Sequence, residues 1–118
     1  MQDDASQARA GEEIMSRADT IAITVSTLCE YCWVLTKVYK VSSAEIARAI
    51  RTLYFTSKVT MDRLAVDAGL AVVDAGGDFA DGAIAHEGRW MGGDTFVSFD
   101  KTAVKLISDQ GHSSLLLR

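Results

Sequence analysis

Two aspartates three residues apart give the first indication of chemistry in this sequence. Asp78 and Asp81 lie in the segment GGDFADGAIAHEG, after a glycine pair and before a run of small residues typical of a helix. An Asp at a helix start accepts hydrogen bonds from free N–H groups, and a second acid in the first turn suits the helix dipole. Paired carboxylates also bind divalent cations. The segment alone leaves both interpretations open.

Two further acids lie at the starts of expected helices. Asp100 directly follows the apolar stretch TFVSF, and Glu30 comes soon after the β-branched stretch TIAITV. Each acid has a local explanation, because Asp100 suits a helix cap and Thr27-Leu28-Cys29-Glu30 matches a capping box. The elements around these acids decide whether they can meet.

The sequence predicts strands alternating with helices. β-branched and apolar runs predict strands at 20–25, 59–61, 95–99 and 113–117. Apolar residues at helical spacing, with Ser, Asp and Gly boundary signals, predict helices at 3–17, 26–39, 42–54, 62–75, 78–90 and 101–108. This order predicts an α/β fold, with parallel strands joined by right-handed crossovers and helices on both faces of the sheet.

Glu30, Asp81 and Asp100 are expected to meet at one edge of this fold, because α/β sheets gather ligands beyond the carboxyl ends of their strands. Clustered carboxylates repel one another without a cation, and Mg²⁺ or Mn²⁺ converts that repulsion into binding. Such a site would activate water and stabilise the charge that develops on a phosphate, with one metal or with two about 3.5 to 4 Å apart. Phosphodiester hydrolysis is therefore the expected reaction.

Composition places these residues in one soluble globular domain spanning 1–118, with 48% hydrophobic and 24% charged residues. A net charge of −4 argues against a surface that coats nucleic acid, but not against a metal-dependent enzyme that cleaves it. No apolar run reaches the roughly 20 residues that span a membrane, and the acidic N-terminal segment does not match a signal peptide. We expect a cytoplasmic protein without a membrane partner.

Two segments resemble the PIN-domain ribonucleases, specifically the VapC toxins of bacterial type II toxin-antitoxin systems. They are TVSTLCEYCWVLTKVY and GGDFADGAIAHEGRWMGGDTFVSFDKTAVKL. The most specific part is D-G-A-I-A followed by T-F-V-S-F-D, which resembles the family's third acid opening a helix and fourth acid ending a strand. The resemblance covers nearly the whole chain.

The resemblance assigns Glu30, Asp81 and Asp100 to the family's second, third and fourth acids. Asp78, one turn before Asp81, is either an outer-shell ligand or the helix cap. The resemblance also implies a PIN-like three-layer fold with a mostly parallel sheet, and RNA cleavage that depends on Mg²⁺ or Mn²⁺. Its implied partners are an RNA substrate, a VapB-type antitoxin and a second copy of the chain in a homodimer.

One family feature has no counterpart in this sequence. Family members begin with a short apolar strand that ends in an Asp within a D-T-N-like motif, and this Asp is the first metal ligand. Residues 1–7 resemble the stretch that follows this strand. In the family, the strand itself lies at the centre of the sheet, between the equivalents of TIAITV and TFVSF. We therefore expect a chain beginning at Met1 to fold poorly, rearrange or swap, and to have weak or no nuclease activity. Comparing it with an upstream-extended version tests this expectation, which equal metal-dependent activity in both would contradict.

Other chemistry is also consistent with parts of the sequence. Cys29 and Cys32 form a C-x-x-C pair near a helix start, where a thioredoxin-like redox site would lie, but the chain has no proline to oppose the thiols. Buried packing thiols are the alternative. Zinc could draw on these cysteines with His86 and His112, although neither histidine has the paired spacing of a structural site. His86 is expected to be an ordinary helix residue.

A third alternative is a non-catalytic module that binds a VapB-type antitoxin or a second copy of itself. The surface for it would be an apolar helical face formed by Trp33, Tyr39, Ile46, Ile50 and Tyr54. Amphipathic helices usually bury such a face in their own core. We therefore expect these residues to form core rather than interface.

Overall fold

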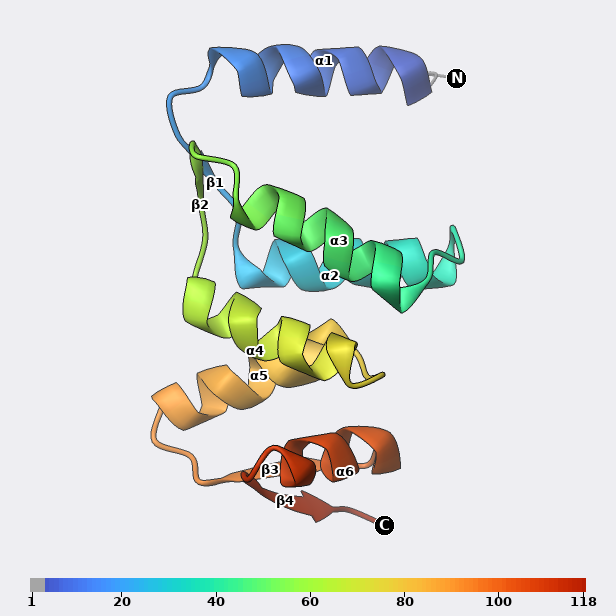
Figure 1. Ribbon diagram of the computed structural model, residues 1–118, viewed down its shortest axis with the longest axis vertical. Coiled ribbons are helices and arrows are strands. Elements are labelled where there is room, and N and C mark those ends of the chain that lie inside the picture. Colours follow the sequence, from blue (N-terminus) through green and yellow to red (C-terminus); the bar gives the residue numbers. More distant parts are fainter. Residues whose placement is uncertain (1–3) are drawn as a thin grey trace.

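Six helices and four short strands make up the part of the chain described by the computed structural model, residues 4–118, in the order α1 β1 α2 α3 β2 α4 α5 β3 α6 β4 (Figure 1). The helices are α1 (Asp4–Arg17), α2 (Val25–Lys37), α3 (Ser43–Tyr54), α4 (Arg63–Asp74), α5 (Phe79–Trp90) and α6 (Lys101–Asp109). The strands are β1 (Ile21–Ala22), β2 (Val59–Thr60), β3 (Thr95–Ser98) and β4 (Ser113–Leu116). The α/β class is confirmed, whereas the predicted helix start at Asp3 lies outside the described residues.

The strands form two separate parallel pairs. Ile21 pairs with Val59 in β1–β2, and Thr95 pairs with Ser113 in β3–β4. In Figure 1 the two pairs lie on opposite sides of α4 and α5. The parallel direction agrees with the prediction, but the described residues do not form the single sheet that we expected. The predicted strand at 20–25 is cut to two residues because Thr24 caps α2 and Val25 already belongs to that helix.

Side-chain signals set most helix starts. The Ser42 hydroxyl accepts from the Glu45 N–H at 3.3 Å, and Asp62 Oδ1 accepts from the Ala65 N–H at 3.2 Å. These caps satisfy N–H groups that have no partner inside the helix. The predicted boundaries of α3 and α4 are therefore confirmed to within about a residue.

Helices α4 and α5 pack against each other more closely than any other pair, because glycines lie where they meet. A Cβ at Gly82 would lie 2.3 Å from the Ala68 carbonyl oxygen and 2.8 Å from the Cα of Gly69. The Phe79 ring lies against Gly69, where an added Cβ would be 2.5 Å from it. The glycine of the D-G-A-I-A segment is thus required by packing, and this contact fixes the backbone that carries Asp81.

Buried apolar side chains form two clusters on either side of this helix pair. The larger joins α2, α3, α4 and α5, and its members include Leu28, Ile46, Ile50, Val66, Leu70 and Phe79. The smaller joins α4, α5 and α6 through Val72, Ala85 and Ile107. Each such valine, leucine, isoleucine or phenylalanine stabilises the fold by about 1.5 to 3 kcal/mol on burial. Helices α2 and α3 on one side, and α6 on the other, are therefore held to the central pair α4 and α5.

The helical face predicted as core divides in two. Ile46 and Ile50 are buried as expected, but Trp33 is 61% exposed and Tyr39 is 64% exposed. The expectation that the whole face forms core is wrong for these two aromatic residues, because α2 buries the positions of Leu28 and Cys32 instead, and Tyr39 follows the end of α2 at Lys37.

Strand β3 is less covered than its apolar sequence predicted. Phe96 packs against the smaller core cluster, but Val97 is 48% exposed and the following Phe99 is 76% exposed. Strand side chains alternate between faces, and α6 covers one face of β3–β4. The prediction that helices cover both faces of the sheet is therefore wrong here.

Candidate metal centre

Three aspartates meet where α5 and α6 begin. One carboxylate oxygen from each of Asp78, Asp81 and Asp100 lies within 4.8 Å of the other two. They line an open hollow of about 230 Å³ whose other walls are Gly76, Gly77, Thr102 and Ala103. Two helix N-termini therefore bring together acids 22 residues apart in the chain.

Each aspartate is held differently. Asp100 caps α6, as its local pattern predicted: its Oδ1 accepts from the N–H groups of Thr102 at 2.9 Å and Ala103 at 3.2 Å. This leaves Oδ2 for a ligand. Asp78 occupies the cap position of α5, but its side chain makes no capping hydrogen bond, and Asp81 lies in the first turn. The predicted capping role of Asp78 is thus confirmed in position only.

The cluster is electrostatically unfavourable without a counter-charge. The pKa of Asp81 is raised above its ordinary value of 3.8, first by burial, then by the negative charges of Asp78 and Asp100. All three causes disfavour the charged carboxylate of Asp81. A bound cation would offset the repulsion from Asp78 and Asp100.

This raised pKa predicts how stability depends on pH. Charging Asp81 costs folding free energy because its pKa is higher in the folded chain than in the unfolded one. The cost is absent well below pH 3.8, grows as the pH rises through the folded-state pKa, and is constant above it. Without metal, Asp81→Asn should therefore melt a few degrees above the wild type at pH 7.

Thermal melts followed by circular dichroism in EDTA, from pH 3 to pH 8, measure this difference. The two melting temperatures should converge at the acidic end of the series. A variant less stable than the wild type at pH 7 would show that Asp81 stabilises the fold by some other contact.

Glu30 lies outside the aspartate cluster. It is exposed in the second turn of α2, and its carboxylate is not among the atoms that meet at 4.8 Å. The predicted capping box at 27–30 is wrong, because the cap of α2 is Thr24, three residues before Thr27, and its Oγ1 accepts from the Thr27 N–H at 3.1 Å. Asp78 instead completes the group, and its spacing of one helical turn from Asp81 was the sequence signal for this.

The three aspartates fit a hard divalent cation. Their donors are all carboxylate oxygens, which Mg²⁺ and Mn²⁺ prefer. A bound cation would offset the repulsion from Asp78 and Asp100 that helps to raise the pKa of Asp81, and the capping bonds of Asp100 use only its Oδ1. Asp78, Asp81 and Asp100 are therefore the residues that would hold such an ion.

The cysteines have the opposite character from a redox pair. The pKa of Cys32 is raised to about 12, mainly by burial and then by Cys29 and Asp78. The pKa of Cys29 is also raised, by burial and by the charges of Glu87 and Asp81. A redox thiol needs a depressed pKa to form the reactive thiolate. Cys32 is buried in the larger core cluster and Cys29 packs against it, and no cysteine or histidine joins a metal-binding group within residues 4–118.

No family model, curated protein or solved structure matches the chain. Among residues 4–118, no helix has the length and apolar character needed to cross a membrane.

Proposed function

We propose that this protein is a metal-dependent endoribonuclease of the VapC type, built on a PIN-like three-layer fold and acting in the cytoplasm. The observation that carries the proposal is the meeting of Asp78, Asp81 and Asp100 within 4.8 Å. Two of these acids are those that the D-G-A-I-A and T-F-V-S-F-D motifs assign to the family's third and fourth ligands.

The residues divide the work between binding and positioning. Asp81 and Asp100 offer carboxylate oxygens from two helix starts, and Asp78 lies beside them at the cap position of α5. Bound Mg²⁺ or Mn²⁺ would activate water and neutralise charge on the phosphate. Gly82 keeps α5 against α4, so Asp81 is held on a rigid helix rather than on a loop.

Cleavage of RNA with and without metal tests this function. A labelled single-stranded RNA should be cut slowly in Mg²⁺ or Mn²⁺, and not in EDTA, with activity returning when the metal is restored. We expect a low rate because three carboxylates meet here where the family uses four acids. Metal-independent cleavage, or no cleavage by a chain that demonstrably binds Mn²⁺, would contradict the nuclease proposal.

A second candidate is a non-catalytic module that binds a VapB-type antitoxin or a second copy of the chain. Exposed apolar side chains favour it: Val97, Phe99 and Leu115 are 48%, 76% and 54% exposed on and beside β3–β4. Large exposed apolar patches mark interaction sites. Light scattering of the protein alone would then report a dimer, or light scattering of a mixture with the antitoxin would report a complex that persists in EDTA. A monomer that binds no antitoxin would remove this candidate.

A further inference from the structure

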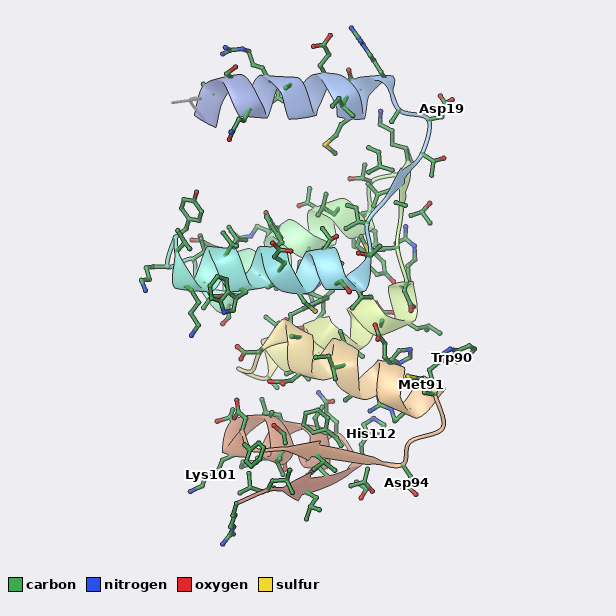
Figure 2. All side chains as sticks on the ribbon, turned by 180° about the vertical axis from the view of Figure 1, so that it is seen from behind. Asp19, Trp90, Met91, Asp94, Lys101 and His112 are labelled. Carbon is green, nitrogen blue, oxygen red and sulfur yellow. The ribbon has the colours of Figure 1, made fainter. Side chains whose placement is uncertain are left out.

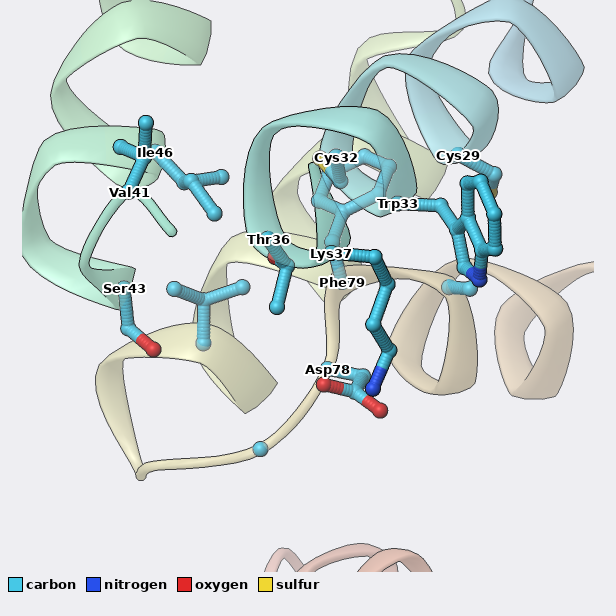
Figure 3. A pocket seen from close by; sticks show the side chains of 13 residues that line it. Cys29, Cys32, Trp33, Thr36, Lys37, Val41, Ser43, Ile46, Asp78 and Phe79 are labelled. Atoms are coloured by element: carbon cyan, nitrogen blue, oxygen red, sulfur yellow. The ribbon is translucent and has the colours of Figure 1, made fainter. Parts of the chain in front are cut away.

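A second hollow adjoins the three-aspartate cluster, and Gly77 and Asp78 line both. It measures about 150 Å³ and lies between α2, the start of α3 and the start of α5 (Figure 3). Its inner wall is apolar and is formed by Cys32, Val41, Ile46, Val73 and Phe79. Pockets for drug-sized ligands begin near 300 Å³, so this one suits a single small planar group.

Trp33 and Lys37 form the rim of this hollow. They are one helical turn apart on α2, so they lie on the same side of the helix. Figure 3 shows the Lys37 ammonium pointing toward the Asp78 carboxylate, with the Trp33 indole beside it. Among the described residues, neither side chain is used in a hydrogen bond or an ion pair. An aromatic face and a cation are therefore both available beside the acids.

We propose that this rim binds one unstacked base of a single-stranded RNA, next to a phosphate at the three-aspartate cluster. The inference rests on the proposed function and adds a base-binding subsite to it. Trp33 stacks on the base, and Lys37 contacts the neighbouring phosphate. Splayed single-stranded bases are commonly recognised by aromatic stacking combined with a basic contact to the backbone.

The size and charge of the hollow favour a nucleotide over a peptide. One planar ring fits a volume in which a helix or several side chains would not. Lys37, whose ammonium points toward Asp78, supplies a positive charge for a phosphate beside the three-aspartate cluster. The two hollows share Asp78, so a base and the neighbouring phosphate of one RNA chain can occupy them together.

Tryptophan fluorescence tests the base contact without requiring cleavage. The chain has two tryptophans, and Trp90 is 84% exposed at the far end of α5, about 18 Å along a 12-residue helix (Figure 2). In a Trp90→Phe protein, hexauridylate should quench Trp33 in a saturable way. In a Trp33→Phe protein, the same probe should not quench Trp90.

Affinity measurements on the full chain complete the test. Trp33→Ala should bind hexauridylate roughly ten- to a hundred-fold more weakly, and Trp90→Ala should bind it normally. An abasic hexamer with the same backbone charge should bind as weakly to the wild type as hexauridylate does to Trp33→Ala. Lys37→Gln should weaken both probes and reduce the salt dependence of binding.

Several outcomes would overturn the base site. They are equal binding of the abasic and normal hexamers, quenching of Trp90 instead of Trp33, binding of apolar peptides only, and no binding in either EDTA or Mg²⁺. If binding depends on Trp33 but no variant ever cleaves RNA, the nuclease function fails and the base site stands. If the chain cleaves RNA and Trp33→Ala changes neither binding nor KM, the base site fails and the nuclease function stands.

Discussion

Gly82→Ala should destabilise the protein by about 3 kcal/mol, a large part of the roughly 5 to 15 kcal/mol that stabilises a domain. The added Cβ would lie 2.3 Å from the Ala68 carbonyl oxygen, which is backbone and cannot rotate away. Helices α4 and α5 would have to separate, and both core clusters depend on them. Urea unfolding followed by circular dichroism measures the loss as a lower transition midpoint.

Gly88→Ala is the matched control for this prediction. Gly88 lies in the same helix, and a Cβ there would meet nothing within 4 Å. Because alanine favours a helix over glycine by about 1 kcal/mol, this variant should be as stable as the wild type or slightly more stable. Similar midpoints for Gly82→Ala and Gly88→Ala would show that the close contact of α4 with α5 does not hold in solution.

Asp81→Asn should reduce metal-dependent RNA cleavage by at least about a hundred-fold. The substitution keeps the shape of the side chain but removes the charge that would bind the cation. Since this variant should be more stable than the wild type without metal, unfolding cannot account for the loss. Initial rates with a labelled RNA in Mg²⁺ measure the effect.

Asp67→Asn is the control for Asp81→Asn, because it removes one negative charge at a position outside the three-aspartate cluster. Asp67 is exposed on α4 and is not among the three aspartates that meet. Its cleavage rate should match that of the wild type. A comparable loss in both variants would indicate that net charge, rather than a ligand position, controls the activity.

Local signals in the sequence were sufficient to predict the helices. Ser42 and Asp62 are capping residues whose hydrogen bonds depend only on the next few residues, and the glycines at 76–77 and 92–93 end helices as expected. The start of α2 was predicted to within one residue, but its capping residue was not, because two threonines, Thr24 and Thr27, both suit a cap. Only the folded backbone shows that Thr24 accepts the hydrogen bond.

Long-range arrangement was less predictable. Strand direction followed from the alternation of helices and strands, but which strands pair depends on contacts far apart in the chain. The same limit applies to the site: Asp81 and Asp100 were predicted to meet and do lie together, whereas Glu30 lies outside their group. Asp78 has both a local and a chemical explanation, and sequence spacing alone does not choose between them.

The most direct test of the metal centre is a crystal of the protein soaked in Mn²⁺ and measured for anomalous scattering. We predict one strong peak between Asp78, Asp81 and Asp100, with carboxylate oxygens roughly 2 Å from it, and no such peak in crystals of Asp81→Asn. A map without a peak at the three aspartates, or with its main peak at Glu30, would contradict the proposed centre.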